Sequence, residues 1–430
     1  MFRRRAASFL YLSLRWSSTR AVKPWIHMNA AGASPQPPIV HDTMVRLLEL
    51  ERDIGAYAAA PEANENDARI ALGRLLKCGR DEIALAESAQ RAWALAFSSL
   101  DLAAKDHILC FEDEYAGNAV TFLQTARRTG CTLEVLPMRS DGIVDVDALS
   151  RALTSRSDPM QRTVVCLTHM QTSGSIVQPA ARVGHIAKEH GALYILDACQ
   201  TIGAMHVDVR ALRCDFAAGT GRKWLRGPRG TGFLYARRGA LAGEEPLVGE
   251  PTTIDHTSVQ WTGRETYQLA ADASRYELWE SSLACRAGLA AAATLCAEED
   301  PAAIFARATG LARRLRSGLT SIDGLVVRDA PPSFDEAVAE SLGASRGAIV
   351  TFEVESTRAL PAAEIHQQLV QRRIGASVSP PTHHFDEDVW ARPPVVRLSP
   401  TYFNTEEEVD AVVAAVRDIV AERGVRNRGD

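Results

Sequence analysis

Short apolar runs alternate with helical patterns between residues 83 and 236, and this alternation restricts the possible folds more than any other feature. The runs are Ile83–Ala86, His107–Phe111, Leu133–Leu136, Val164–Thr168, Leu193–Leu196, Phe216–Ala218 and Gly232–Ala236. Helical patterns fill most gaps, at Gln90–Leu100, Ala116–Arg128, Val146–Leu153 and Ala180–His190. The alternation predicts an α/β fold with a mainly parallel seven-stranded sheet that helices cover on both faces. The dense run of strands from 163 to 236 is expected at its centre.

Two regions flank this alternation. Asn29 to Pro38 (NAAGASPQPP) is turn-rich and predicts a loop, and the helical spacing that follows, from Thr43 to Leu76, is interrupted near Pro61. A second pattern begins after about residue 285, with helical spacing at Ala284–Leu319, Ala362–Arg372 and Glu406–Arg423 and possible strands at Leu325–Arg328, Ala348–Val354 and Val395–Leu398. We therefore predict a large domain over residues 25–285 and a smaller α+β domain over residues 286–430.

Composition narrows the class of partner. The chain has 430 residues, 46% of them hydrophobic and 23% charged, as in ordinary soluble enzymes. A formal net charge of -5 gives no reason to expect nucleic acid or an anionic membrane as partner, and no apolar run approaches the roughly 20 residues of a membrane span. The eight cysteines show neither CxxC pairs nor metal-ligand spacing. We expect a small-molecule substrate and no bound metal.

The start of the chain differs from the rest. Residues 1–24 hold five arginines among serines and apolar residues, and no acidic residue occurs before Asp42. This composition is typical of a mitochondrial transit peptide. The alternatives are a basic tail or a misassigned start codon, in which case the protein would be cytoplasmic.

The stretch from Leu193 to Tyr235 carries the strongest chemical signal. An apolar strand ends on Asp197, and the carboxyl ends of parallel strands face the crevice where such sheets bind ligands. A second short strand leads into the polar turn Thr220-Gly221-Arg222-Lys223, which glycines follow at 227, 230 and 232.

This stretch supplies what pyridoxal 5'-phosphate (PLP) requires of a protein. A lysine must bind the cofactor as a Schiff base and later move protons at the substrate Cα. A carboxylate must pair with the pyridine nitrogen, and hydroxyls, N–H groups and cations must hold the phosphate. Lys223, Asp197, and Thr220 with Arg222 fit these roles in order.

The arrangement D-A-C-Q, then T-G-R-K, then G-P-R-G-T-G-F-L-Y resembles the class V aminotransferase family, which includes cysteine desulfurases, isopenicillin N epimerase and kynureninase. The resemblance runs from about Asn29 to Val420 and implies the fold of PLP-dependent transferases of type I. It implies that Asp197 pairs with the pyridine nitrogen, that Gln200 reaches the phenolic oxygen and that Lys223 is the catalytic lysine. Arg222 stands where many relatives have a histidine.

The resemblance assigns further cofactor-binding positions. Ser88, Ala89 and Gln90 occupy the place of the phosphate cup, where relatives usually have Gly-Thr-Thr; an ordinary helix N-cap at Ser88 is the alternative. Tyr115 falls where the family stacks a ring on the cofactor, unless it simply packs at a helix start. Thr172 falls where many relatives place an asparagine near the phenolic oxygen.

Substrate and partner-subunit positions follow in the same way. The resemblance places Asn29 and Arg397 at the substrate, with Arg397 on the α-carboxylate; for Arg397 a surface salt bridge is the alternative. The segment Ser274 to Ser281 (SRYELWES) resembles one that relatives extend across a dimer interface, although Trp279 could equally be a core residue. The resemblance implies a homodimer with shared active sites. A helix capped near Asn404 or Thr405 follows Arg397.

One absence bears on the reaction. Desulfurases of this family carry a nucleophilic cysteine in the small domain ahead of the carboxylate-binding arginine, whereas Gly375 to Val396 contains none and the last cysteine is Cys296. The motifs resemble most closely the sulfoxide lyases that act on hercynylcysteine sulfoxide. We therefore predict a PLP-dependent C–S β-lyase, with His383 and His384 either near the substrate or merely exposed. The alternatives are an epimerase or aminotransferase, a desulfurase, which the missing cysteine disfavours, and from another class a non-catalytic relative.

Overall fold

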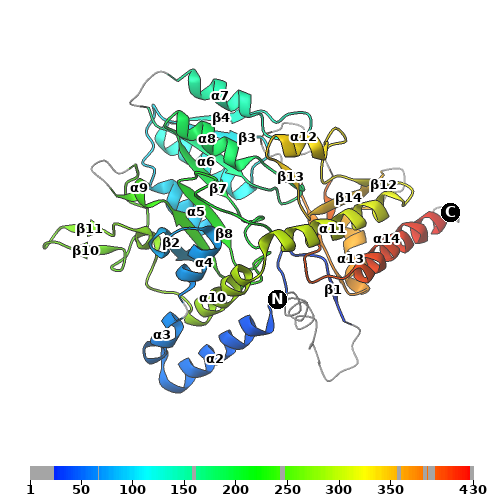
Figure 1. Ribbon diagram of the computed structural model, residues 1–430, viewed down its shortest axis with the longest axis horizontal. Coiled ribbons are helices and arrows are strands. Elements are labelled where there is room, and N and C mark those ends of the chain that lie inside the picture. The colour runs from blue at the N-terminus through cyan, green and yellow to red at the C-terminus, as the bar shows by residue number, and fades with distance from the viewer. Residues whose placement is uncertain are drawn as a thin grey trace, which may run out of the picture.

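The protein is represented by a computed structural model, which describes residues 24–65, 67–156, 161–242, 247–355, 360–380, 385 and 393–426. Two sheets organise the chain, and Figure 1 shows them side by side with helices around each. The strands of the larger sheet are β2 (Ile83–Ala86), β3 (His107–Phe111), β4 (Thr132–Leu136), β5 (Thr163–Thr168), β7 (Leu193–Asp197), β8 (Phe216–Thr220) and β9 (Gly232–Ala236).

The larger sheet has the strand order β2-β9-β8-β7-β5-β3-β4. The pairs among β4, β3, β5, β7 and β8 are parallel, and β9 runs antiparallel to both of its neighbours. This arrangement confirms the predicted mainly parallel, seven-stranded sheet. The central strand β7 ends on Asp197, which lies in register with Thr168 of β5 and Ala218 of β8.

Each face of this sheet has its own apolar core, because successive side chains of a strand point to opposite faces. Ile195 of β7 belongs to one core and Leu196 to the other. The helices α5 (Ala89–Ser98) and α6 (Ala116–Thr129) cover the face of Ile195. The opposite face is covered by α4 (Ala68–Leu76), α7 (Val146–Thr154), α8 (Ala180–Glu189) and α10 (Leu283–Glu298). This two-sided cover is what the strand–helix alternation predicts.

The helical region before β2 is divided differently from the prediction. It consists of α2 (Pro38–Ile54), α3 (Ala56–Glu65) and α4, and Pro61 lies inside α3. The predicted interruption near Pro61 is therefore wrong. Gly55 ends α2 with a φ of 83°, which a residue with a β-carbon rarely adopts, and the Asp67 carboxylate caps α4 by accepting from the Arg69 N–H.

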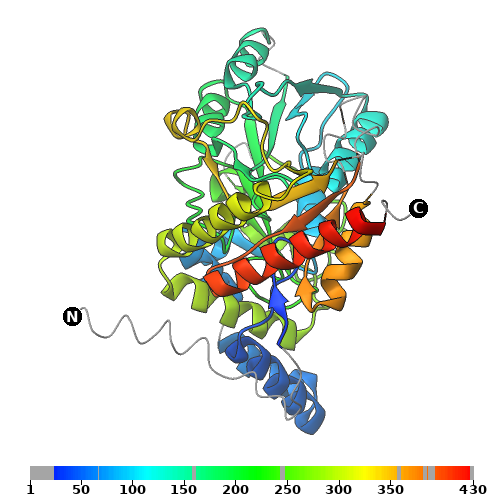
Figure 2. The ribbon, with the colours of Figure 1, turned by 90° about the vertical axis from the view of Figure 1, so that its right-hand side faces the viewer.

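The smaller sheet is antiparallel and has the order β12-β14-β17-β16. Its strands are β12 (Leu325–Val327), β14 (Val350–Val354), β16 (Ser377–Ser379) and β17 (Val395–Leu398), and its helices are α11 (Pro301–Thr320), α13 (Ala362–Gln371) and α14 (Glu406–Arg426). Figure 2 shows α11 and α14 side by side across this part of the molecule. Thr405 caps α14, because its hydroxyl accepts from the Glu408 N–H.

Several contacts cross the predicted domain boundary at residue 285. Near the start of the chain, β1 (Ile26–His27) pairs with β15 (Ile374–Gly375), and Met28 belongs to the core of the smaller sheet. Conversely, α10 packs on α2 and α4 of the large-sheet side. The boundary itself stays a prediction.

The remaining elements are η1 (Arg80–Glu82), β6 (Ile176–Val177), α9 (Arg238–Leu241), β10 (Val259–Trp261), β11 (Tyr267–Leu269), η2 (Ala273–Tyr276), α12 (Glu336–Ser341) and β13 (Ser345–Arg346).

Residues 1–23 of the predicted transit peptide lie outside the described residues, so that prediction stays open. Within the described ranges, no helix combines the length and apolar character that crossing a membrane requires.

Candidate active site

One cavity opens at the carboxyl ends of the central strands β5, β7 and β8. It is lined by Ser88, Ala89, Gln90, Tyr115, Thr168, Met170, Thr172, Asp197, Cys199, Gln200, Thr220, Arg222 and Lys223. Every residue that the sequence places at the cofactor is in this set. The chain thus brings together five separate segments at the crevice where parallel sheets bind ligands.

Lys223 lies half-buried in the turn that follows β8. Burial lowers the pKa of its amine, and the nearby Cys199 and Asp197 oppose this effect. In the described part of the chain, no group forms a hydrogen bond with its Nζ. The amine is therefore closer to its neutral, nucleophilic form than an exposed lysine would be.

The Asp197 carboxylate is held by one hydrogen bond on each oxygen. Oδ1 accepts from the Cys199 N–H at 2.9 Å, and Oδ2 accepts from Asn118 Nδ2 at 2.9 Å. Asn118 also donates to Glu114 at 3.3 Å. The sequence reasoning missed both Glu114 and Asn118, although their four-residue spacing around the start of a predicted helix, next to Tyr115, was a usable signal.

Gln200 has a fixed amide orientation. The indole N–H of Trp224 donates to Gln200 Oε1 at 2.8 Å, and Gln200 Nε2 donates to the Ala31 carbonyl at 3.2 Å and to Thr172 Oγ1 at 3.3 Å. Gln200 and Thr172, both predicted near the phenolic oxygen, therefore contact each other.

Ser88 begins the helix α5 at the other end of the cavity. Its hydroxyl accepts from the Arg91 N–H at 3.1 Å, so the N-cap interpretation is confirmed. This cap leaves the N–H groups of Ala89 and Gln90 in the first turn, where helices bind anions. A β-carbon on Gly232 would lie 2.2 Å from the Ser88 carbonyl carbon, so only glycine fits beneath this turn.

Thr220 and Arg222 flank Lys223 in sequence and lie in the same cavity. The Thr220 hydroxyl donates to the Thr231 carbonyl at 3.3 Å, and an Arg222 Nη1 donates to the Gly32 carbonyl. Burial and the charge of Arg229 lower the pKa of Arg222. A cation held in this way favours an anionic ligand group such as a phosphate.

Tyr115 precedes α6, and 43% of its side chain is exposed. Its ring lines the cavity and also lies against Gly117 in the first turn of α6, so both interpretations of Tyr115 stay open. Its backbone N–H donates to Thr168 Oγ1 at 3.3 Å, and Gln90 Nε2 donates to the Gly117 carbonyl at 3.2 Å, which ties α5 to the start of α6.

Arg397 of β17 contacts Asn29 of the N-terminal segment and Thr172 of the large-sheet side. Its Nη1 donates to the carbonyl and hydroxyl oxygens of Thr172 at 2.8 and 2.7 Å, Nε donates to Ser377 Oγ at 3.0 Å, and Nη2 lies 3.4 Å from Asn29 Oδ1. The alternative of a surface salt bridge is wrong, because Arg397 is buried and no described Asp or Glu pairs with it. Burial and Arg222 lower its pKa to about 10, so it stays charged at neutral pH.

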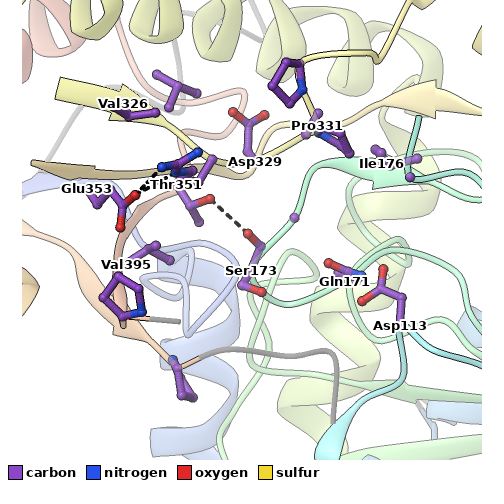
Figure 3. Close-up of a pocket in the computed structure, with 18 residues that line it drawn as sticks. Asp113, Gln171, Ser173, Ile176, Val326, Asp329, Pro331, Thr351, Glu353 and Val395 are labelled. Carbon is purple, nitrogen blue, oxygen red and sulfur yellow. Dashed lines mark hydrogen bonds and ion pairs between the residues drawn. The ribbon is translucent and has the colours of Figure 1, made fainter. Parts of the chain in front are cut away.

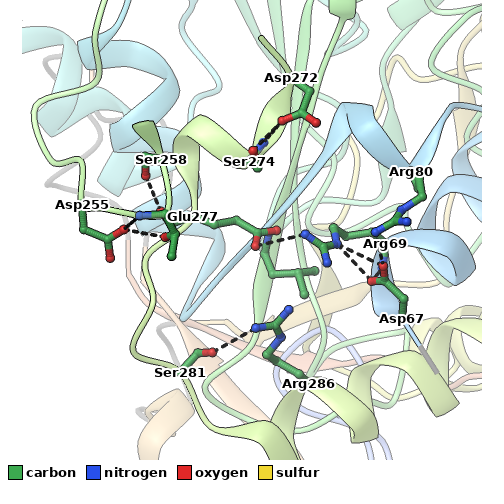
Figure 4. Close-up of polar contacts among 12 residues, drawn as sticks. Asp67, Arg69, Arg80, Asp255, Ser258, Asp272, Ser274, Glu277, Ser281 and Arg286 are labelled. Atoms are coloured by element: carbon green, nitrogen blue, oxygen red, sulfur yellow. Dashed lines mark hydrogen bonds and ion pairs between the residues drawn. The ribbon is translucent and has the colours of Figure 1, made fainter. Parts of the chain in front are cut away.

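The segment Ser274 to Ser281 packs beside the edge strand β2, and Figure 4 shows its polar contacts. Glu277 anchors it by accepting from the Leu85 N–H at 2.9 Å and from Arg69 at 3.4 Å, and Arg69 in turn pairs with Asp67. Trp279 is 54% exposed, so its interpretation as a core residue is wrong.

A second cavity lies between the two sheets, beside the loop that carries Thr172 (Figure 3). Asp113 and Gln171 face it from the large-sheet side, and Thr351 reaches across to donate to the Ser173 carbonyl at 3.0 Å. Asp113 is buried with one oxygen unpartnered, and burial raises its pKa well above the usual range.

His383 and His384 lie outside the described residues, so their predicted proximity to substrate stays open.

Comparison with known families identifies the class of protein. The family model for aminotransferase class-V matches residues 26–412. The chain therefore belongs to the aminotransferase class-V family.

Individual relatives carry several activities. The chain is 29% identical to probable cysteine desulfurase 2 of Mycobacterium leprae over 90% of both chains. It is 28% identical to isopenicillin N epimerase of Streptomyces clavuligerus, over 83% of this chain and 84% of that protein.

Solved structures show the same fold. The cysteine desulfurase of Thermococcus onnurineus superposes with a TM-score of 0.80 at 20% identity, over 93% of this chain and 95% of that one. The cystine C–S lyase C-DES, solved with cysteine persulfide, gives a TM-score of 0.76 at 21% identity, over 92% and 97%.

The predicted family, the type I fold and the cofactor are confirmed: the protein is a PLP-dependent enzyme of class V. The cavity suits this cofactor chemically. It offers an amine for the aldehyde, a carboxylate for the pyridine nitrogen, and a helix N-terminus, a hydroxyl and a guanidinium for the phosphate. The closer resemblance to sulfoxide lyases stays a prediction.

Proposed function

We propose that the cavity binds PLP through Lys223, with Asp197 at the pyridine nitrogen and Gln200 and Thr172 near the phenolic oxygen. Tyr115 lies against the ring. The phosphate is held by the α5 N-terminus at Ser88, Ala89 and Gln90, together with Thr220 and Arg222. The convergence of these residues on one cavity supports the assignment.

We propose further that the enzyme is a C–S β-lyase acting on a cysteine S-conjugate or its sulfoxide. The observation that carries this proposal is the site's lack of a sulfur-accepting cysteine. Gly375 to Val396 contains no cysteine. The one cysteine lining the described cavity, Cys199, has a pKa that burial raises well above its usual range, so its thiol stays protonated and unreactive.

Binding of the amino-acid substrate follows from the charge of Arg397. A buried guanidinium that pairs with no carboxylate of the described residues provides a strong bidentate site for the substrate α-carboxylate. Asn29 and Ser377 hold two edges of this guanidinium and limit its rotation. The substrate Cα is thereby placed for proton transfer.

Lys223 takes the Cα proton in this mechanism, because its lowered pKa favours the free amine that a base requires. The bound cofactor supplies an electron sink for the charge that develops at Cα. The electron pair of the breaking C–S bond leaves with sulfur, so no protein nucleophile is required. One water is consumed, and thiol, pyruvate and ammonia are the products; a sulfoxide substrate releases a sulfenic acid in place of the thiol.

The products distinguish a C–S β-lyase from a cysteine desulfurase. Incubation of the purified enzyme with S-alkylcysteine and its sulfoxide should yield pyruvate in a one-to-one ratio with the released sulfur compound. Lys223→Ala should abolish pyruvate formation, and Lys105→Ala, a lysine distant in sequence and outside the cavity, should not. Conversion of free cysteine to alanine, with a persulfide left on the enzyme, would instead indicate a desulfurase and overturn the lyase.

An epimerase is the second candidate, since the similarity to isopenicillin N epimerase extends over most of both chains. Both reactions begin with removal of the Cα proton, but an epimerase returns a proton on the other face. Loss of optical rotation with retention of the C–S bond would favour it.

We propose that the enzyme is a homodimer with shared active sites. Trp261 and Tyr267 are exposed on the β10–β11 hairpin, which projects from the body in Figure 1, and Trp279 is exposed beyond it. The double variant Trp261→Arg, Trp279→Arg should give a monomer in light scattering, whereas Val338→Arg on α12 should not. A monomeric wild type would contradict the proposal.

We also propose that residues 1–24 direct the protein to mitochondria. A reporter fused behind these residues should enter the organelle, and the variant with Arg3, Arg4 and Arg5 changed to glutamate should not. A reporter that stays in the cytoplasm would support the alternative localisation.

A further inference from the structure

A ladder of hydrogen bonds crosses the carboxyl ends of three neighbouring strands beneath the cofactor cavity. Asp197 ends β7, Thr168 ends β5, and Glu114 follows β3. Thr168 donates to Glu114 through its N–H at 3.1 Å and through its hydroxyl at 3.0 Å. Asn118 Nδ2 then donates to Glu114 at 3.3 Å and to Asp197 at 2.9 Å. All four side chains are at most 7% exposed.

The ladder joins two carboxyl groups through one amide. A primary amide has two N–H donors, and here each is directed to a different carboxylate. Because the ionised Asp197 carboxylate can only accept, the Asn118 amide cannot reverse without placing its oxygen against that carboxylate. Glu114 accepts the second N–H, so Asn118 is held at both neighbours and in turn fixes the position of the Asp197 Oδ2 atom.

We propose that Asn118, held by Glu114 and Thr168, is a positioning residue that aligns the Asp197 carboxylate with the pyridine nitrogen of the cofactor. The Cys199 N–H holds the other oxygen, so the plane of the carboxylate is set from both sides. The inference rests on the proposed role of Asp197 at the pyridine nitrogen. It does not depend on whether the reaction is elimination or epimerisation.

The ladder also reaches the ring-facing side of the cavity. The Thr168 hydroxyl that donates to Glu114 accepts from the Tyr115 N–H at 3.3 Å. One buried network thus connects the backbone at Tyr115 with Asp197. Buried polar networks of this kind are rigid when every member is satisfied.

A cofactor analogue isolates the predicted effect. We would measure the affinity of the apoenzyme for PLP and for 1-deazapyridoxal phosphate, in which a C–H group replaces the pyridine nitrogen. Asn118→Ala should weaken binding of PLP by about tenfold or more, because a misaligned carboxylate forms a poorer charge-assisted hydrogen bond. Binding of the deaza analogue should change by less than about threefold.

The protonation of the bound PLP provides a second measurement. In Asn118→Ala, the pKa of the pyridine nitrogen, followed by nitrogen NMR of isotopically labelled PLP, should fall, since a misaligned carboxylate stabilises the protonated pyridine less. Glu114→Gln, which keeps an acceptor for Asn118, should give a smaller change in the same direction.

The control is Glu112→Gln in the same turn; Glu112 accepts from the Met138 N–H, and none of the described hydrogen bonds of the ladder involves it. Thermal unfolding of each apoenzyme identifies variants that fail to fold. If Asn118→Ala fails, the same measurements are made on Asn118→Ser, which is a smaller change. Equal loss of affinity for both cofactors would show a merely structural role and overturn the inference. Failure of PLP to bind the wild type would instead overturn the proposed function.

Discussion

Arg397 shows at the residue scale how a buried charge prepares a binding site. The guanidinium donates to neutral oxygens of Thr172, Ser377 and Asn29, and none of these compensates its charge. Such a group costs free energy when buried, and a ligand carboxylate recovers part of that cost.

Arg397→Gln should therefore raise KM for the amino-acid substrate about tenfold or more, the equivalent of one charge-assisted hydrogen bond. Steady-state kinetics with the substrate and its α-carboxamide provide the measurement. The carboxamide should respond little to the substitution. Arg328→Gln, at a salt bridge with Glu353 on the smaller sheet, is the matched control. An unchanged KM for the carboxylate substrate would remove Arg397 from the site.

Glu114 makes stability depend on pH. Burial, with a contribution from Asp197, raises its pKa from the usual 4.5 to about 8. The folded state therefore binds more protons than the unfolded state between these values, so the stabilising protonated form is lost as pH rises from about 5 to about 8.

The free energy of unfolding of wild type, minus that of Glu114→Gln, should consequently fall across this interval by up to a few kcal/mol. Urea unfolding of both apoenzymes at pH 5, 6, 7 and 8 tests the sign. A difference that rises with pH would mean that Glu114 is ionised in the folded protein.

At the scale of elements, the turn between β2 and α5 depends on close backbone contact. The ideal β-carbon position on Gly232 of β9 lies 2.2 Å from the Ser88 carbonyl carbon and 2.4 Å from the Ala89 nitrogen. Both are backbone atoms and cannot rotate away. A substitution here must move the turn that carries the proposed phosphate site.

Gly232→Ala should destabilise the protein by about 1–3 kcal/mol and weaken PLP binding. Gly310→Ala in α11 is the matched control, because nothing lies within 4 Å of its added β-carbon; it should stabilise the helix by up to about 1 kcal/mol. Chemical unfolding and cofactor titration measure both effects. If Gly232→Ala has the stability and the PLP affinity of the wild type, the turn can shift to make room for the β-carbon.

At the scale of the whole molecule, Arg226 joins three distant parts of the chain. It follows the Lys223 turn, its Nε donates to the Pro35 carbonyl at 3.1 Å, and its Nη1 donates to the Tyr402 hydroxyl at 2.9 Å. Its guanidinium carbon lies 4.4 Å from the centre of the Phe403 ring. The N-terminal loop, the large sheet and the end of the smaller sheet therefore share one side chain.

Arg226→Ala should lower the free energy of unfolding by about 2 kcal/mol or more. It should also speed hydrogen exchange at residues 30–37 and 399–404. Arg226→Lys keeps the charge but loses the planar guanidinium group. Its free energy of unfolding and its exchange rates should lie between those of wild type and Arg226→Ala. Unchanged exchange in both segments would mean that the parts are held together elsewhere.

Local pattern was sufficient to predict the strands of the large sheet, because apolar runs of three to five residues between turn signals are compatible with few structures other than buried strands. The same holds for Asp197 and Lys223, which stand at recognisable spacing beside those strands. The error near Pro61 arose because Gly55 and the Asp67 cap, rather than the proline, end and begin the helices.

What depends on long-range contacts was not predictable from the residues alone. Asn29 and Arg397 are 368 positions apart, and only the pairing of the N-terminal segment with the smaller sheet brings them together. The reversal of β9 and the Glu114–Asn118–Asp197 ladder likewise depend on which strands become neighbours. The sequence by itself determined the elements and the chemical groups of this protein, since propensity and spacing act locally. Tertiary structure alone decided which of these groups meet, because burial and hydrogen bonding act between distant segments.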